Sequence, residues 1–205
     1  LASENPGVKT ADLNNVEFIK YKARDGRMIP AYITVPKGKA PFPLVVLPHG
    51  GPHVNEVIGY DEWGQVLANA GYMVLQPQYR MSVGWGKSHF DAGYGEHGGA
   101  MQDDKDDGAL ALVKDGLVDK DRIPMFGWSY GGYAALVATQ RTPQIYQCAI
   151  AGAAVADPEK SYYGRRGTDT PKALDDWAKR RGMIGWNPIK NVEKALNSGG
   201  HLSGV

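Results

Sequence analysis

The sequence has little of several features that would narrow its function at once. Its single cysteine, Cys148, excludes a disulfide within the chain. Its 23 basic and 22 acidic residues nearly cancel to a net charge of +1, which gives no electrostatic reason to expect nucleic acid or an acidic membrane as a partner. No apolar run approaches the ~18–20 residues of a membrane-spanning helix. We therefore expect a soluble protein, cytoplasmic or periplasmic, that binds neither nucleic acid nor membrane.

The two ends of the chain also lack expected features. Residues 1–6 show no basic leader, no apolar signal core and no initiator methionine, so we expect a piece of a longer chain. Residues 196–205 are rich in glycine and resemble the remnant of a tag or a disordered end. The 205 residues as a whole suit a single domain. Cys148 lies in an apolar run, where we expect a buried small side chain rather than a reactive thiol.

Apolar residues and glycines recur in a pattern that indicates strands alternating with helices. This order is typical of a mostly parallel, doubly wound α/β sheet, with an antiparallel hairpin at its N-terminal edge. We expect a long loop over residues 80–99, and short polar helical pieces such as 171–181 after Ala156. The expected strands cover residues 16–21, 28–35, 42–47, 72–75, 122–126 and 148–152, and the expected helices 61–70, 101–113 and 130–139.

One motif predicts a nucleophile. Ser129 stands at the centre of Gly127-Trp128-Ser129-Tyr130-Gly131, between an expected strand and an expected helix. A sharp turn at this place exposes the serine oxygen above the sheet, and it requires small residues two positions before and after the serine. Gly127 and Gly131 meet that requirement. Ser129 is therefore the expected nucleophile of a hydrolase.

A second motif supplies candidate oxyanion donors. His49-Gly50-Gly51-Pro52 directly follows the expected strand 42–47. Backbone N–H groups at such a turn, together with the N–H of the residue after the nucleophile, can stabilise a developing oxyanion. Taken alone, this motif indicates only a tight turn. Combined with the serine motif, it predicts Gly51 and Tyr130 as the two donors.

These motifs together resemble the catalytic α/β-hydrolase domain of the prolyl oligopeptidase family, on its dipeptidyl-peptidase and acylaminoacyl-peptidase branch. The resemblance runs from about Val16 to Ala195. It depends on several phrases in a fixed order: His49-Gly50-Gly51-Pro52, Tyr79-Arg80 with Gly84-Trp85-Gly86, Met101-Gln102-Asp103-Asp104, Asp121-Arg122-Ile123, Gly127-Trp128-Ser129-Tyr130-Gly131-Gly132-Tyr133 and Asn187-Pro188-Ile189.

The resemblance implies a serine hydrolase that acts on short peptides or acylated amino acids, often with esterase activity as well. Family members usually carry a β-propeller ahead of this domain, which this sequence does not encode. The family also places its triad Asp and His after two further strands that follow Asn187-Pro188-Ile189. We therefore expect a domain truncated at its C-terminus, without the last strands and with weak activity by itself.

The residues offer few candidates for the missing base and acid. His201 is the one histidine that follows Ser129, but it lies in the glycine-rich tail. Asp157, at the end of the last expected strand, is better explained as a cap of the next turn. We expect His49 to be a structural residue of its turn. His53 flanks the same turn, and His89 and His97, in the expected long loop, are expected at the surface or hydrogen-bonded.

No cofactor and no metal site is predicted. The acidic cluster 103–107 would place only some carboxylates on one helix face, so we expect a solvated first turn of a helix. The pairs Glu96-His97 and His49…His53 lack the third ligand and the spacing of a zinc site.

Two alternatives to a peptidase remain open. The first is a non-catalytic hydrolase-fold fragment that binds a partner, for example a homo-oligomer formed through an exposed sheet edge. The second is a carboxylesterase acting on a small ester, because the same acyl-transfer site serves esters and peptides.

Overall fold

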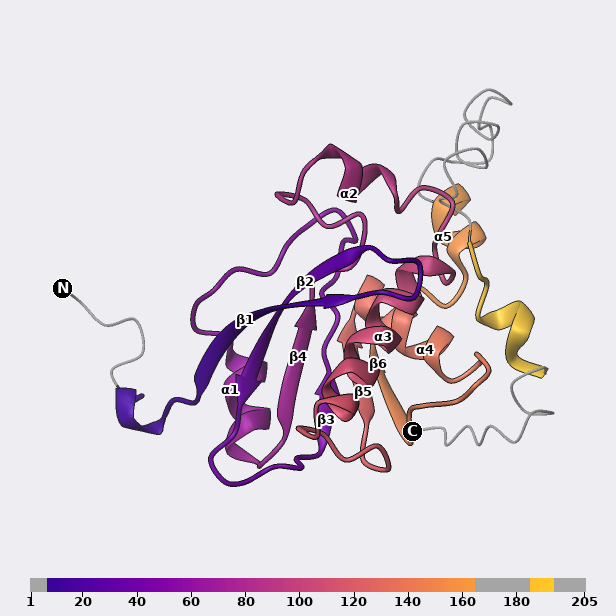
Figure 1. The fold of residues 1–205 in the computed structure, drawn as a ribbon. Coiled ribbons are helices and arrows are strands. Elements are labelled where there is room, and N and C mark those ends of the chain that lie inside the picture. The colour runs from indigo at the N-terminus through magenta and orange to yellow at the C-terminus, as the bar shows by residue number, and fades with distance from the viewer. Residues whose placement is uncertain (1–6, 165–184, 194–205) are drawn as a thin grey trace.

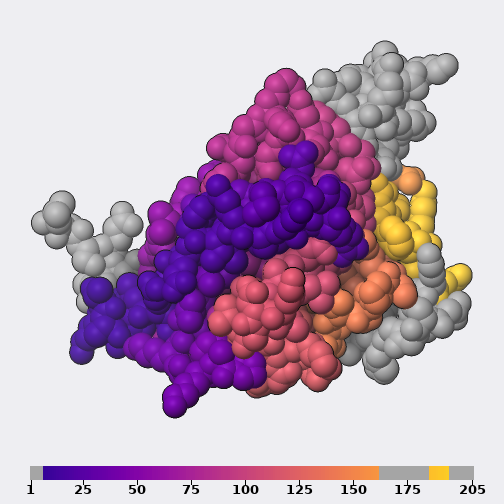
Figure 2. All heavy atoms as spheres, in the orientation of Figure 1, coloured from indigo at the N-terminus to yellow at the C-terminus, as the bar shows by residue number. Residues whose placement is uncertain are grey.

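The N-terminal hairpin forms as the alternating sequence predicts. The computed structural model describes residues 7–164 and 185–193. After a short 3-10 helix, η1 (Thr10–Asp12), strand β1 (Asn15–Lys22) pairs antiparallel with β2 (Met28–Val35). The turn between them uses Gly26 at φ 90°, and the backbone N–H of Arg27 donates to the Asp25 side chain over 3.1 Å. Figure 2 shows this hairpin, in indigo, lying across one face of the molecule.

Within the described residues, six strands form one mixed sheet (Figure 1). Its order is β1-β2-β4-β3-β5-β6, and β2 is antiparallel to both β1 and β4, whereas β3, β4, β5 and β6 run parallel to one another. The sheet therefore combines a parallel half with an antiparallel edge, as the sequence predicts. The parallel strands are β3 (Leu44–Val46), β4 (Met73–Pro77), β5 (Pro124–Trp128) and β6 (Cys148–Gly152).

Helices cover both faces of the sheet, which makes it doubly wound. Gly64 of α1 (Glu62–Asn69) lies against Gln76 of β4, whereas Gly108 of α3 (Ala100–Lys114) lies against Leu75. Consecutive residues of a strand point to opposite faces, so α1 and α3 lie on opposite sides. Helix α4 (Tyr130–Ala138) packs on β5 and β6 and contacts α3. Helix α5 (Pro158–Gly164) and the 3-10 helix η2 (Ile189–Asn191) follow β6.

Two apolar clusters fill the interior. The larger one lies between the sheet and helices α3 and α4, and includes Leu75, Met125 and Ala135, which are fully buried. The smaller one is largely aromatic and contains Tyr79, Met101, Tyr130, Tyr133, Met81 and Val137. In the part of the chain that the structure describes, no helix is both long and apolar enough to cross a membrane.

Several boundaries differ from those expected. Strand β3 covers three residues instead of six, because Pro43 has no N–H to donate and Phe42 pairs only in an isolated bridge with Val118. Strand β5 begins two residues later and reaches Trp128. The segment 80–99, expected as a loop, contains helix α2 (Lys87–Asp91). The expected pieces 171–181 and the tail 196–205 lie outside the described residues.

The expectation that Cys148 is buried is wrong. Its side chain is exposed at the start of β6, and Ile150 on the same strand is 60% exposed. The reason is position in the sheet: β6 forms the edge of the sheet in the described part of the chain, and α4 packs against its other face, on which Ala149 and Ala151 contact the main core. The apolar composition of residues 148–152 is typical of a strand, but only one face of β6 is covered within the described residues.

Candidate active site

The topology of the sheet creates a crevice between β3 and β5. Strand β3 leads through α1 to β4 on one side, whereas β5 leads through α4 to β6 on the other side. Neighbouring parallel strands whose connections depart in opposite directions leave a crevice beyond their carboxyl ends, where α/β proteins bind ligands. The loop after β3 holds His49-Gly50-Gly51, and β5 ends directly before Ser129. The two sequence motifs thus meet at this place.

Ser129 adopts the strained backbone of a sharp strand-to-helix turn. Its φ of 57° and ψ of −115° lie outside the regions that non-glycine residues favour. The surroundings fix this conformation, because the Ser129 N–H donates to the Gly152 carbonyl over 3.0 Å and its carbonyl accepts from the Tyr133 N–H over 3.0 Å. Strain of this kind, held by its neighbours, is typical of functional sites. The predicted turn is therefore present at Ser129.

The glycines around Ser129 are required by close backbone contacts. A Cβ at Gly127 would overlap the backbone of Gly131, and a Cβ at Gly131 would overlap the carbonyl oxygen of Pro48. A Cβ at Gly132 would lie 2.5 Å from the carbonyl oxygen of Gly152, closer than real contacts allow. The spacing of glycines that identified the motif is thus explained by how tightly β3, β5 and α4 approach one another.

The turn after β3 lies against the serine. A Cβ built on Gly50 would lie 3.5 Å from Ser129 Cβ and 4.0 Å from its Oγ. Gly51 follows with a φ of 109°, a conformation that favours glycine. Among the described residues, nothing accepts a hydrogen bond from the Gly51 N–H. Tyr130 is the first residue of α4, and its N–H has no partner within the helix.

His49 is held in place by both ring nitrogens. Its Nδ1 lies 2.7 Å from the Gly50 carbonyl, which can only accept, so Nδ1 donates. Its Nε2 lies 2.8 Å from Ser82 Oγ. Burial lowers the pKa of His49 to about 4, so the imidazole is neutral, and the Ser82 hydroxyl beside Nε2 donates to the Tyr79 carbonyl over 2.7 Å. His49 is thus a structural residue of its turn, as the sequence predicts.

None of the other described histidines forms a hydrogen bond with Ser129. His89 is buried, with Nε2 2.9 Å from the Gln78 carbonyl, and so is hydrogen-bonded as expected. His97 is not exposed, and among the described residues its buried Nε2 has no hydrogen-bond partner. Exposed His53 lies against Phe90, and His201 lies outside the described residues. Within the described chain, no side chain forms a hydrogen bond with Ser129 Oγ.

Asp157 behaves as the sequence predicts. Its carboxylate accepts from the Lys160 N–H over 3.0 Å at the start of α5, and from the Asn187 side chain over 3.0 Å. These bonds lower the pKa of Asp157, the contact with Lys160 most of all. Asp157 therefore caps α5 and ties it to the segment 185–193.

The expectation that residues 103–107 form a solvated turn is wrong. Asp104 is fully buried, and its carboxylate accepts from Arg80 Nε over 2.8 Å and Nη2 over 2.6 Å. Asp106 is also buried, and it accepts from the Tyr146 hydroxyl over 2.7 Å and pairs with Arg141. Burial raises the pKa of Asp106. The partners of these carboxylates lie in the segments after β4 and after α4, so the two carboxylates anchor helix α3 from within.

The burial of Lys105, in the middle of the acidic cluster 103–107, is the least expected feature of helix α3. It is fully buried, its Nζ donates to the Met101 carbonyl over 2.6 Å, and it lies 3.6 Å from the centre of the Tyr79 ring. Among the described residues, no carboxylate pairs with it. Burial lowers the pKa of Lys105 to about 7. Sequence reasoning missed this residue because its acidic neighbours suggest solvent.

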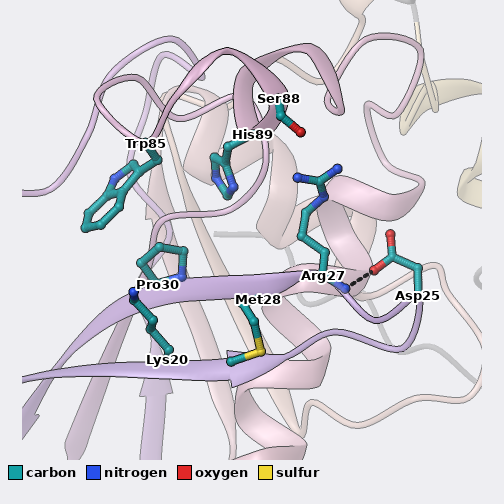
Figure 3. Close-up of a pocket in the computed structure, with 8 residues that line it drawn as sticks. All are labelled: Lys20, Asp25, Arg27, Met28, Pro30, Trp85, Ser88 and His89. Atoms are coloured by element: carbon teal, nitrogen blue, oxygen red, sulfur yellow. Dashed lines mark hydrogen bonds between the residues drawn. The ribbon is translucent and has the colours of Figure 1, made fainter.

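A cavity of about 510 Å³ lies between the hairpin and α2, away from the serine. Figure 3 shows Arg27, the residue before β2, pointing towards Ser88 and His89 of α2, with Trp85 on the far side of His89 and Lys20 on β1. Neither Ser129 nor the two expected oxyanion donors line this cavity. Asp25, which lines the cavity, forms an ion pair with Arg80 over 2.9 Å, and Arg80 in turn pairs with the buried Asp104.

A doubly wound sheet with a strained serine between its fifth strand and the following helix defines the chain as an α/β-hydrolase. The sequence model of the prolyl oligopeptidase family matches residues 60–201, more than half of the chain. The chain therefore belongs to the prolyl oligopeptidase family, whose members are serine peptidases.

Curated relatives agree with this assignment. The chain is 39% identical over 141 residues to dipeptidyl aminopeptidase BIII of Pseudoxanthomonas mexicana, covering 64% of this chain and 20% of that protein. It is 33% identical over 171 residues to dipeptidyl peptidase family member 6 of Caenorhabditis elegans, covering 72% of this chain and 23% of that protein. The chain thus spans about a fifth of the length of these relatives.

Solved structures show the same fold. The crystal structure of puromycin hydrolase matches with a TM-score of 0.79 and 24% identity, over 92% of this chain and 30% of that one. The uncomplexed acylaminoacyl peptidase of Pyrococcus horikoshii matches with a TM-score of 0.70 and 21% identity, over 90% of this chain and 29% of that one. At this identity the likeness concerns the fold alone.

Proposed function

We propose that Ser129 is the nucleophile of a serine hydrolase that acts on short peptides or acylated amino acids. The observation that carries the proposal is the strained backbone of Ser129, held against the His49-Gly50-Gly51 turn at the carboxyl ends of β3 and β5. A backbone in this conformation exposes the serine oxygen where the crevice admits an acyl group. Membership of a family of serine peptidases supports the same chemistry.

In the proposed reaction, Ser129 Oγ attacks the carbonyl carbon of the substrate and gives its proton to a base. The tetrahedral oxyanion accepts hydrogen bonds from the backbone N–H groups of Gly51 and Tyr130, which are free to donate. The intermediate collapses as the leaving amine or alcohol departs with a proton. Water then attacks the acyl-serine by the same route and releases the acid.

The proposal includes weak activity for this chain by itself. A serine hydroxyl needs a base within hydrogen-bond reach, and the described residues place none beside Ser129 Oγ. His49 has both nitrogens engaged, and its lowered pKa makes it a poor proton acceptor. An oxyanion hole and substrate binding without a base retain ~10³–10⁴-fold acceleration over water. We therefore expect slow acylation of Ser129 rather than full turnover.

The test is covalent labelling with an aminoalkyl phosphonate diphenyl ester, read by intact-protein mass spectrometry and peptide mapping. We expect slow labelling on Ser129 and none in Ser129→Ala. Ser161→Ala, which alters a serine of α5, is the matched control and should label like the parent chain. Rapid stoichiometric labelling would contradict the proposed weakness, and labelling that survives in Ser129→Ala would overturn the nucleophile.

The choice between peptidase and esterase is tested with paired substrates. The relatives described above carry the names of peptidases, which favours peptides for this chain. We expect measurable release from aminoacyl p-nitroanilides at a rate within about tenfold of that from p-nitrophenyl esters. Hydrolysis of the esters alone would favour a carboxylesterase. Both rates must vanish in Ser129→Ala.

Self-association is a second candidate role, favoured by the exposed edge strand. Strand β6 ends the sheet within the described residues, and its Ile150 and Cys148 are exposed. An unpaired strand edge of this kind can pair with a second copy of the chain. Small-angle X-ray scattering should then give a mass that rises with concentration, whereas a monomer at all concentrations would exclude this role.

A further inference from the structure

A buried ammonium lies beside two aromatic rings that are close to the proposed oxyanion hole. Lys105 of α3 is fully buried, and its Nζ is 3.6 Å from the centre of the Tyr79 ring and 5.6 Å from that of Tyr130. Among the described residues, its one hydrogen bond goes to the Met101 carbonyl over 2.6 Å. A desolvated ammonium over an aromatic ring is attracted to the ring face, and more strongly than at an exposed site.

Tyr79 connects this ammonium to the turn after β3. Its hydroxyl donates to the His49 carbonyl over 2.7 Å, and its ring stacks on the His49 ring with centres 4.4 Å apart. His49 is two residues before Gly51. The position of the Tyr79 ring thus determines where the turn, with the Gly51 N–H, can lie.

Tyr130 connects the same ammonium to the serine. Its ring stacks on that of Tyr79 with centres 5.7 Å apart, and its hydroxyl lies 3.5 Å from Met101 Sδ. Its own N–H is the second proposed donor, and it directly follows Ser129. One cation therefore contacts both aromatic rings that support the two halves of the oxyanion hole.

We propose that Lys105 is a positioning residue, whose charge holds Tyr79 and Tyr130 so that the Gly51 and Tyr130 N–H groups converge on the oxyanion. This inference rests on the proposed role of Ser129 and deepens it. Lys105 itself does not touch the substrate. The ammonium has no carboxylate partner among the described residues, so burying it costs stability, and buried charges of this kind are candidates for a functional role.

The charge of Lys105 makes the arrangement sensitive to pH. Its pKa of about 7 means that the ammonium is present below neutrality and lost above it. The neighbouring imidazoles of His49 and His97 have pKa values lowered to about 4, so they are neutral on both sides of this change. The tyrosines beside Lys105 have pKa values raised well above 10. The charged groups that face it are Asp104, Asp106, Arg80 and Arg141.

The first experiment measures this coupling without any activity. Amide signals of Gly51 and Tyr130 are followed by NMR of the full ¹⁵N-labelled chain between pH 5.5 and 9.5. We expect both to shift with an inflection near neutral pH that is absent in Lys105→Met and kept in Lys114→Met, an exposed lysine of the same helix. Persistence of the inflection in Lys105→Met, or its absence from the parent chain, would overturn the inference.

The second experiment measures the consequence for Ser129. The rate of phosphonate labelling is compared between the parent chain and Lys105→Met across the same pH range. We expect Lys105→Met to label about tenfold more slowly at pH 6, with the difference vanishing above pH 9 as the parent loses its charge. A ratio of the two labelling rates that does not change with pH would contradict the positioning role, because Lys105 would then act through packing and not through its charge.

The two outcomes separate the inference from the function on which it rests. If Ser129→Ala labels like the parent, the proposed nucleophile fails whatever Lys105 does. If labelling needs Ser129 but Lys105→Met labels at the parent rate at pH 6, only the positioning role fails. Lys105→Arg, which keeps a cation at this place, should recover part of the rate. Circular dichroism confirms that each variant is folded.

Discussion

Helix α3 and strand β6 differ in polarity, and in the structure each has the burial that its sequence predicts for the other. The first half of α3 is a run of charges, yet Asp104 and Lys105 are fully buried. Strand β6 is a run of small and apolar residues, yet its Ile150 and Cys148 are exposed. Burial here depends on where an element lies relative to the sheet. Helix α3 packs on one face of the sheet over β1, β4 and β3, whereas β6 forms the edge of the described sheet.

The difference has an energetic consequence. Buried charges are tolerated only when they are paired and hydrogen-bonded, so α3 should be sensitive to the loss of a partner. An exposed apolar side chain has gained little from folding, so β6 should tolerate substitution. The predictions below test this contrast, from the largest expected effect to the smallest.

Asp104→Ala should give the largest loss of stability. It removes the carboxylate that accepts from Arg80 Nε and Nη2, and it leaves a nearly buried guanidinium with only the partly exposed Asp25 as its partner. Breaking a buried pair in this way costs about 3–5 kcal/mol. Urea unfolding at pH 7 measures the loss. Asp121→Ala, which breaks the exposed pair with Lys120, is the control and should change stability by less than about 0.5 kcal/mol.

Lys105→Met should change stability in the opposite direction. The folded chain holds the Lys105 pKa at about 7, against 10.5 for an ordinary lysine. Between these values the unfolded chain binds the extra proton, so the stability of the parent rises with pH across this window. Met avoids the cost of desolvating the ammonium, so we expect a gain on the scale of the ~1–4 kcal/mol found when buried ion pairs are replaced by apolar side chains of similar size. The gain should be largest at or below pH 7.

Urea unfolding of Lys105→Met and the parent at pH 6, 8 and 10 checks this prediction. The difference in free energy of unfolding should shrink as the pH rises towards 10.5. A constant difference would mean that Lys105 keeps the pKa of an ordinary lysine in the folded chain, so that both states bind the same number of protons and only its packing matters. Greater stability together with slower labelling at pH 6 would identify a residue kept for positioning at the expense of stability.

Gly131→Ala tests the tight approach on which the serine turn depends. The new Cβ would overlap the Pro48 carbonyl oxygen, so β3 and α4 must move apart. Overpacking of this kind costs about 1–3 kcal/mol. The same displacement should slow the labelling of Ser129. Gly116→Ala is not a matched control because of its φ of 73°, whereas Gly7→Ala meets open space and should change neither quantity.

The serine site could be predicted from the sequence because its signals are local. The spacing of Gly127 and Gly131 reflects a contact between these two residues, although Gly131 also meets the distant Pro48 carbonyl, and the flanking strand and helix follow from periodicity. The fold class followed from the same alternation. Tyr79 and Lys105 could not be assigned in this way, because their contact is made by the folding of α3 across β4. Nor could the exposure of Cys148, which depends on which elements cover the edge of the sheet.

Ile150→Ala should have the smallest effect of the series. The side chain is 60% exposed on β6, so its truncation should change the free energy of unfolding by less than about 0.5 kcal/mol. Ile123→Ala is the matched control, since that isoleucine is 1% exposed and its truncation should cost about 2–5 kcal/mol. Urea unfolding measures both. A loss above ~2 kcal/mol at Ile150 would mean that this face is covered in solution. If scattering then shows a dimer that Ile150→Ala dissociates, the cover is a second copy of the chain, and the contrast between α3 and β6 holds only for the monomer.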